Sequence, residues 1–311
     1  MTYKICGYHL ANSKSGLRSI QNFHHYLDKI IPTWVEIKSD GSLEEKSSDQ
    51  EFKLLTGLKK KRSIMPLAQN YQLNSRVSNL LLNDSAARER AIENLILYLN
   101  KYGFGGVNID LEGVKIGNQE NYTGFIARMA AAFHQEGYRL GLSIPAKSEN
   151  SKDSTWSGAY NYRLLGEIAD EIMIMAYDYH WSGGPPGPIA PLSWVQDVID
   201  FAIIEIPLEK IYLGISFYGY DWIIGSDSSA EGLSYYQIKK LIEKYNSRIE
   251  WDQDSQSPYL RYNKGSEQHE VWFENQESIR KKIQLIKEFQ LAGAAFWRLG
   301  LEDEGVWEVI R

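Results

Sequence analysis

The sequence predicts an α/β fold, a (β/α)8 TIM barrel with a small α+β insertion between the seventh and eighth strands. Three observations lead to this prediction. Eight short apolar runs recur along the 311 residues, segments with helical periodicity separate them, and one separation is far longer than the rest. Eight strands that alternate with helices in a chain of this length favour a closed parallel barrel over an open doubly wound sheet.

The predicted strands are apolar runs bounded by turn residues. They cover residues 4–8, 34–37, 64–67, 107–111, 139–144, 171–176, 211–217 and 293–297. One helix between them is indicated by an apolar stripe over residues 92–99, with Asp84 and Ser85 as candidate N-caps. A similar stripe over residues 279–286 predicts the helix before the last strand.

The long separation, residues 220–292, exceeds what one crossover helix requires. Its excess is expected to form a helix over residues 235–245 and then short strands rich in Trp and Tyr. We therefore assign residues 1–225 and 276–311 to the barrel, and residues 226–275 to an insertion that stands on the catalytic rim. No low-complexity segment separates the two, so they are expected to share one rigid unit.

The composition excludes several classes of protein. Hydrophobic residues make up 43% and charged residues 24%, which excludes a disordered, collagen-like or coiled-coil chain. The net charge of -6 argues against a nucleic-acid partner. The single cysteine, Cys6, excludes an intramolecular disulfide framework and a multi-cysteine metal site. No run has the length of a membrane span, and the start lacks the layout of a signal peptide, so neither is expected in this chain.

The fourth predicted strand carries the most informative polar residues. Because side chains alternate along a strand, Asn108, Asp110 and Glu112 share one face, while Ile109 and Leu111 point to the other. In a barrel the polar face is the lumen, and active sites lie at the carboxyl ends of the strands. A salt-bridged structural cluster would show the same pattern. The cost of burying two adjacent carboxylates favours a functional site.

This strand resembles the signature D-x-x-D-x-D-x-E of glycoside hydrolase family 18. Glu112 matches the terminal acid, and Asp110 matches the carboxylate two residues before it. The sequence departs from the signature at Asn108 and Gly105, where the family has Asp.

Other segments extend the resemblance along the whole chain. The segment MAYD at residues 175–178 looks like the family's M-x-Y-D motif, and GAAFW at residues 293–297 looks like its eighth strand. Over longer segments, the sequence is closer to the N-acetylglucosaminidases of bacterial spore germination and cortex lysis than to typical chitinases. The segments that carry this narrower likeness are residues 32–34, 65–70, 106–110, 176–181, 218–222 and 271–273.

The resemblance implies a retaining, substrate-assisted glycoside hydrolase, in which the acetamido group of the substrate attacks its own anomeric carbon to form an oxazolinium intermediate. Glu112 would protonate the leaving oxygen and then activate water. Asp110 would accept the acetamide N–H, Tyr177 would donate to the acetamide oxygen, and Asp178 would help to hold that group. Trp297 would stack beneath the sugar.

Further substrate contacts are expected in the lumen and around the rim, where any single residue could instead pack or anchor a loop. The candidates are Asn108, Met175, Tyr8, Gln69, Asn70, Tyr218, Asp221 and Trp222. Asn108 is also expected to donate a hydrogen bond to Asp110. Since Asn adds no like charge, Asp110 should stay ionised to lower pH than beside a third acid.

The implied partner is a polysaccharide that contains N-acetylglucosamine, because substrate assistance requires an N-acetyl group on the scissile sugar. Peptidoglycan of the spore cortex type is the first choice, with chitin oligomers as the alternative. A non-catalytic lectin of the same fold is the alternative of another class, but such lectins typically lack the acid that Glu112 supplies. By resemblance, the protein is expected at the bacterial spore, in the cell envelope or outside the cell, and as a monomer.

No metal and no cofactor are expected. The six histidines show no metal-binding spacing. Ser143, in the segment GLSIP, lacks the second glycine of a nucleophile elbow. The glycines of residues 103–106 lack the spacing of a phosphate-binding loop.

Overall fold

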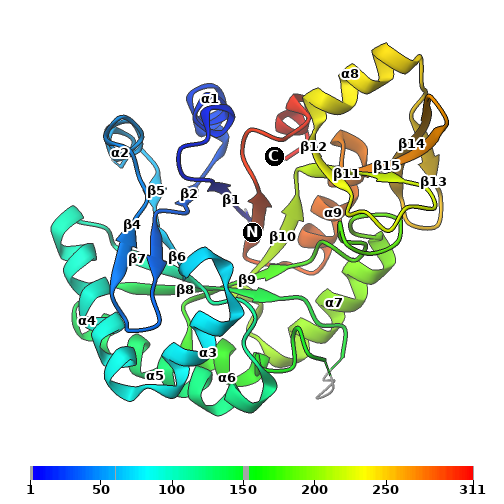
Figure 1. Ribbon diagram of the computed structural model, residues 1–311. Coiled ribbons are helices and arrows are strands. Elements are labelled where there is room, and N and C mark those ends of the chain that lie inside the picture. Colours follow the sequence, from blue (N-terminus) through cyan, green and yellow to red (C-terminus); the bar gives the residue numbers. More distant parts are fainter. Residues whose placement is uncertain (1–2, 60, 150–153, 311) are drawn as a thin grey trace.

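The computed structural model describes residues 3–59, 61–149 and 154–310, so residues 1–2 and 311, at the ends of the predicted barrel, lie outside the described ranges. Its larger sheet has eleven strands (Figure 1). They are β1 (Lys4–His9), β2 (Lys29–Pro32), β3 (Val35–Ile37), β4 (Leu43–Glu45), β5 (Ser63–Ile64), β6 (Leu67–Asn70), β7 (Gly106–Asp110), β8 (Arg139–Pro145), β9 (Glu171–Met175), β10 (Ile211–Ser216) and β16 (Gly293–Trp297).

The strand order gives the sheet a TIM-barrel-like form. It runs β4-β3-β6-β7-β8-β9-β10-β16-β1-β2-β5, with parallel pairs throughout except for the antiparallel pair of β3 and β4. β2 pairs with β5, and β3 pairs with β6. β2 continues directly into β3, and β5 continues directly into β6. The strands near one end of the order, β3 and β6, therefore belong to the same two chain segments as the strands at the other end, β2 and β5. The sheet curls as a result.

Each of the eight predicted runs overlaps a strand of this sheet. The run at residues 64–67 is divided between β5 and β6. The division falls at Pro66, which has no N–H to donate to a neighbouring strand. The sequence analysis missed β2, which ends at Pro32 just before the predicted second run.

Helices connect the strands and cover the outside of the sheet (Figure 1). They are α1 (Lys14–Phe23), α2 (Asp49–Gly57), α3 (Ser75–Asn83), α4 (Ser85–Tyr102), α5 (Gln119–Gln135), α6 (Tyr162–Ile168), α7 (Leu192–Glu205) and α9 (Gln276–Glu288), with short 3-10 helices η1 (His24–Tyr26), η2 (Tyr71–Leu73), η3 (Ile116–Asn118), η4 (Leu208–Lys210) and η5 (Glu304–Glu308). The predicted N-cap of α4 is confirmed at Asp84, whose side chain accepts from the backbone N–H groups of Ala86 and Ala87. The predicted apolar stripe of α4 is buried at Ile92 and Leu95.

A second sheet of five antiparallel strands follows β10, in the order β12-β11-β15-β14-β13. Its strands are β11 (Tyr218–Ile223), β12 (Glu231–Ser234), β13 (Glu250–Asp252), β14 (Ser257–Lys264) and β15 (Glu267–Phe273). The helix α8 (Tyr235–Tyr245) packs on one face through Ile238, against Leu260 and Val271. β11 belongs to this second sheet but begins at Tyr218, before the predicted start of the insertion at residue 226. We therefore propose that the insertion begins at Tyr218.

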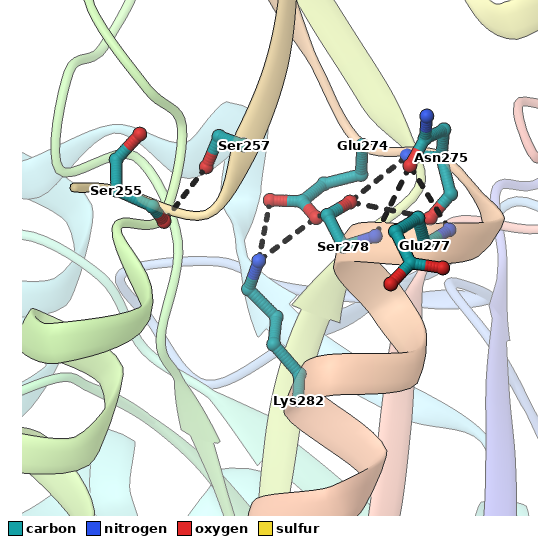
Figure 2. Close-up of polar contacts among 7 residues, drawn as sticks. All are labelled: Ser255, Ser257, Glu274, Asn275, Glu277, Ser278 and Lys282. Atoms are coloured by element: carbon teal, nitrogen blue, oxygen red, sulfur yellow. Dashed lines mark hydrogen bonds and ion pairs between the residues drawn. The ribbon is translucent and has the colours of Figure 1, made fainter. Parts of the chain in front are cut away.

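A buried ion pair lies where β15 leads into α9. Lys282 donates to both carboxylate oxygens of Glu274 at 2.8 Å, and the Ser278 hydroxyl donates to the same carboxylate at 2.6 Å (Figure 2). Glu274 is 2% exposed and Lys282 1% exposed, so this pair joins the end of the smaller sheet to a barrel helix in the interior.

No helix within the described ranges is both long enough and apolar enough to cross a membrane.

Candidate active site

The polar face of β7 lies in the lumen, as the strand alternation predicts. Asn108 is fully buried and Asp110 is 6% exposed, while Val107 and Ile109 on the opposite face belong to the apolar core. Glu112 follows the end of β7 and is half-buried.

Three carboxylates of the site influence one another electrostatically. Burial raises the pKa of Asp110 well above its usual range, and the charge of Glu112 raises it further. Burial also raises the pKa of Glu112, and the charge of Asp178 adds to this effect. A raised pKa favours the protonated form of a carboxyl group, which is the form that a general acid needs, so burial and Asp178 both shift Glu112 toward that form.

Asp178 is held by two tyrosines of β11. The Tyr218 hydroxyl donates to Asp178 Oδ1, and the Tyr220 hydroxyl donates to the same oxygen at 3.2 Å. Burial raises the pKa of Asp178, and these two hydrogen bonds lower it. Asp178 also has a φ of 60°, a left-handed conformation that is uncommon outside glycine and is often found at functional sites.

Tyr177 lies next to this carboxylate group. Burial raises the pKa of its hydroxyl well above the usual value, and the neighbouring Tyr8, Asp110, Asp178 and Glu112 raise it further. The hydroxyl therefore stays protonated and available as a hydrogen-bond donor.

A chain of hydrogen bonds crosses the lumen below Asp110. The Ser143 hydroxyl donates to Asn108 Oδ1 at 2.7 Å, so Tyr8, which lies 2.7 Å from the same Ser143 oxygen, acts as the donor to it. Asn108 Nδ2 donates to Met173 Sδ at 3.2 Å. The expectation that this amide donates to Asp110 is therefore wrong. Residues i and i+2 of a strand are about 6.6 Å apart, so the short Asn side chain reaches across to neighbouring strands instead.

Trp297 ends β16 and is half-buried. Its ring lies 5.4 Å from that of Tyr8 at an interplanar angle of 65°. It also packs against the aromatic cluster that contains Tyr218 and Trp222, so it lies between the lumen and the smaller sheet. Met175 is half-buried at the end of β9.

The two candidates at the end of β6 make polar contacts within the protein. Gln69 is half-buried, and its Nε2 donates to Glu36 Oε1 at 3.4 Å. Asn70 is fully buried, and its Oδ1 accepts from the backbone N–H of Glu112 at 2.9 Å. Asn70 therefore contacts the backbone of the candidate acid.

The candidates on β11 are divided between the two faces of that strand. Tyr218 and Trp222 share a face with Tyr220, and Trp222 Nε1 donates to Gly184 O at 3.0 Å. Asp221 points to the other face, where it accepts from Tyr262 at 2.5 Å and from His269 Nδ1 at 2.9 Å.

Asp221 is thus buried on the face of β11 opposite to Tyr218 and Trp222, and its role in substrate binding stays a prediction. Tyr220 was missed. The two-residue alternation of β11 is the signal that would have found it, since Tyr220 lies between Tyr218 and Trp222 on the same face.

Across the described ranges, no three His, Cys, Asp or Glu side chains are arranged to hold a metal ion.

Comparison with known proteins places the chain in a family. The model of the family described as Glycosyl hydrolases family 18 matches residues 4–302. The Cortical fragment-lytic enzyme of Bacillus subtilis (strain 168) is 33% identical over 243 residues, which is 77% of this chain and 56% of that protein. The chain therefore spans little more than half the length of this relative.

Solved structures share the fold along nearly the whole chain. The Bacillus cereus spore cortex-lytic enzyme SleL has a TM-score of 0.91 at 26% identity, covering 99% of this chain and 73% of that one. A chitinase from Chromobacterium violaceum ATCC 12472 has a TM-score of 0.92 at 25% identity, covering 99% of this chain and 98% of that one.

Proposed function

Because the chain belongs to glycosyl hydrolase family 18 and is a glycoside hydrolase, we propose that it cleaves β-1,4 bonds after N-acetylglucosamine in peptidoglycan of the spore cortex type, by a retaining, substrate-assisted mechanism. The observation that carries the proposal is the position of Glu112. Its pKa is raised by burial and by Asp178, and it follows Asp110 at the carboxyl end of a lumen strand.

In the first step Glu112 donates its proton to the glycosidic oxygen, and the bond between that oxygen and the anomeric carbon breaks. The acetamido oxygen of the substrate forms the new bond to the anomeric carbon, which gives an oxazolinium ion. Asp110 accepts the acetamide N–H, and its negative charge offsets the developing positive charge. Asp110 Oδ1 is buried and has no hydrogen-bond partner within the described residues, so it is open to such a donor.

In the second step the Glu112 carboxylate removes a proton from water. The water oxygen attacks the anomeric carbon from the side that the leaving group vacated. The bond between that carbon and the acetamido oxygen breaks, which restores the acetamide, and the configuration is retained. Tyr177 donates to the acetamide oxygen, and Asp178, held by its two tyrosines, stabilises that arrangement. Trp297 supplies the apolar surface under the sugar.

The names of the relatives support peptidoglycan as the substrate, since the Bacillus subtilis and Bacillus cereus proteins are described as cortical or cortex-lytic. Chitin oligomers are the second candidate. They are supported by the Chromobacterium violaceum chitinase, which this chain covers over 98% of its length.

The test is mass spectrometry of the products from cortex-type peptidoglycan and from chitin oligomers, with wild type and Glu112→Gln run side by side. We expect muropeptides with reducing-end N-acetylglucosamine from the wild type and none from the variant. Glu302→Gln is the matched control, because Glu302 is another buried glutamate with a raised pKa and hydrogen-bonds to Ser19 outside the site. It should keep turnover.

Other products would change the assignment. Cleavage of chitin oligomers alone would replace peptidoglycan by chitin as the substrate. Binding of either glycan by wild type without any product would replace the hydrolase proposal by the lectin alternative.

A further inference from the structure

The peptide group between Leu111 and Glu112 is held at both of its polar atoms. The Tyr160 hydroxyl donates to the Leu111 carbonyl oxygen at 2.7 Å. The Glu112 N–H donates to Asn70 Oδ1 at 2.9 Å. Tyr160 and Asn70 are both fully buried, so water does not compete for either bond.

These contacts lie beyond the end of the strand ladders. The last pair between β6 and β7 is Gln69 with Asp110, and the last pair between β7 and β8 is Ile109 with Leu142. Backbone pairing in the sheet thus stops before Glu112. The side chains of Asn70 and Tyr160 provide the hydrogen bonds that a continued ladder would otherwise make.

The carbonyl group of Glu112 is held as well, because the hydroxyl of the buried Ser78 donates to it at 2.8 Å. Three elements therefore fix the backbone of Glu112: the end of β6, the helix α3, and the segment that precedes α6. The side chains of Asn70, Tyr160 and Ser78 hold the backbone of Leu111 or Glu112, and none of the three is assigned a part in the proposed acid–base chemistry.

We propose that Asn70 and Tyr160 are positioning residues that orient the peptide of Glu112, so that its carboxyl group meets the glycosidic oxygen within hydrogen-bond reach. The inference rests on the proposed role of Glu112 as the general acid. Proton transfer needs a heavy-atom separation of about 2.6–3.2 Å. A displacement of about 1 Å lowers the rate roughly 100-fold, so loss of either bond acts on kcat.

The first test compares two tyrosines that make the same kind of bond. Tyr160→Phe removes the hydroxyl that holds Leu111. Tyr162→Phe removes a buried hydroxyl that donates to the Pro145 carbonyl oxygen, also at 2.7 Å, at the end of β8. Tyr160→Phe is expected to lower kcat about 10- to 100-fold with KM within about twofold, whereas Tyr162→Phe should keep the wild-type kcat. Both variants should lose a similar amount of thermal stability.

The second test uses the other end of the peptide. Asn70→Leu removes the acceptor and should lower kcat, whereas Asn70→Asp keeps an acceptor oxygen and should recover most of the activity. The new carboxylate is close to Glu112 and raises its pKa, because a like charge disfavours ionisation. The basic limb of the pH–rate profile of Asn70→Asp should therefore move to higher pH.

Equal kcat values for the Tyr160→Phe and Tyr162→Phe variants would overturn the positioning role. So would a pH–rate profile for Asn70→Asp that matches wild type together with full activity of Asn70→Leu. Glu112→Gln is measured alongside. If that variant still hydrolyses substrate, the acid assignment falls and the positioning role with it. If it is inactive while Tyr160→Phe behaves as Tyr162→Phe, only the positioning role falls.

Discussion

The three carboxylates at the centre of the site differ in their hydrogen bonds. Asp178 receives two tyrosine hydroxyls, whereas Asp110 Oδ1 has no partner within the described residues. Buried acceptors without partners are rare in native proteins, because an unmet hydrogen bond costs about 1–3 kcal/mol. The pKa is raised at both Asp110 and Glu112, so it is the open acceptor of Asp110 that distinguishes the residue proposed to orient the substrate from the proposed proton donor.

Asn108 provides a test of this separation at the residue scale. Asn108→Asp adds a carboxylate on β7, two residues before Asp110, whose pKa is already raised by burial and by Glu112. A further like charge raises the pKa of Asp110 again. If the ionised form of Asp110 is required, activity is lost as pH falls through this pKa, so a higher pKa moves the acid limb to higher pH.

The measurement is the pH dependence of kcat/KM for wild type and Asn108→Asp, and a shift of about one pH unit is expected. Asn108→Leu, which removes the amide without adding charge, is the control and should leave the acid limb in place. An acid limb that does not move in Asn108→Asp would contradict the prediction.

At the scale of elements, the turn after β7 determines where Glu112 lies. Gly113 follows the acid with a φ of 66°, and a Cβ added there would lie 2.5 Å from Ser75 Cβ of α3. Such a conformation and close approach both require glycine. The turn can therefore bring the chain against α3 directly after Glu112.

Gly113→Ala should destabilise the protein by about 1–2 kcal/mol from the left-handed conformation alone, with the contact to Ser75 adding to this loss. It should also lower kcat, because the turn adjoins the acid. Gly117→Ala is the matched control in the same connection, since nothing lies within 4 Å of its added Cβ. Chemical denaturation and steady-state kinetics measure both. Equal stability of the two variants would contradict this account of the turn.

The sequence analysis predicted most elements but not all of their contacts. The apolar runs and the stripes of α4 and α9 follow from local periodicity, which is visible in the chain itself. The positions of Asp221 and Tyr220 follow from the alternation of β11, which the sequence analysis did not resolve as a strand separate from β10. The break between β10 and β11 falls at Phe217, and the alternation that starts at Tyr218 puts Tyr218 and Tyr220 on the face that meets Asp178.

At the scale of the whole molecule, several contacts join the smaller sheet to the barrel. The buried pair of Glu274 and Lys282 links the end of β15 to α9 (Figure 2). The Ser255 carbonyl accepts from the backbone N–H of Leu192 at 2.9 Å, at the start of α7. The first contact lies directly after β15, which pairs with β11 in the smaller sheet.

Lys282→Met should destabilise the whole protein by about 3–5 kcal/mol, because it leaves the Glu274 carboxylate buried without its cation. Arg280→Ala is the control on the same helix. Arg280 pairs with Glu277 at the surface, and its loss should cost less than about 1 kcal/mol. Equilibrium unfolding in urea gives both values. Similar midpoints for the two variants would show that the buried pair does not stabilise the junction.

The sequence by itself determined the alternation of strands and helices and the buried polar face that Asn108 and Asp110 share. These depend on spacing along one segment, which periodicity reveals. The tertiary structure alone decided that Asn108 reaches Met173, that Asn70 and Tyr160 hold the peptide of Glu112, and that Asp221 faces away. These contacts join residues that are distant in the chain, and they depend on the register of neighbouring strands, here Gln69 opposite Asp110, which no single segment encodes.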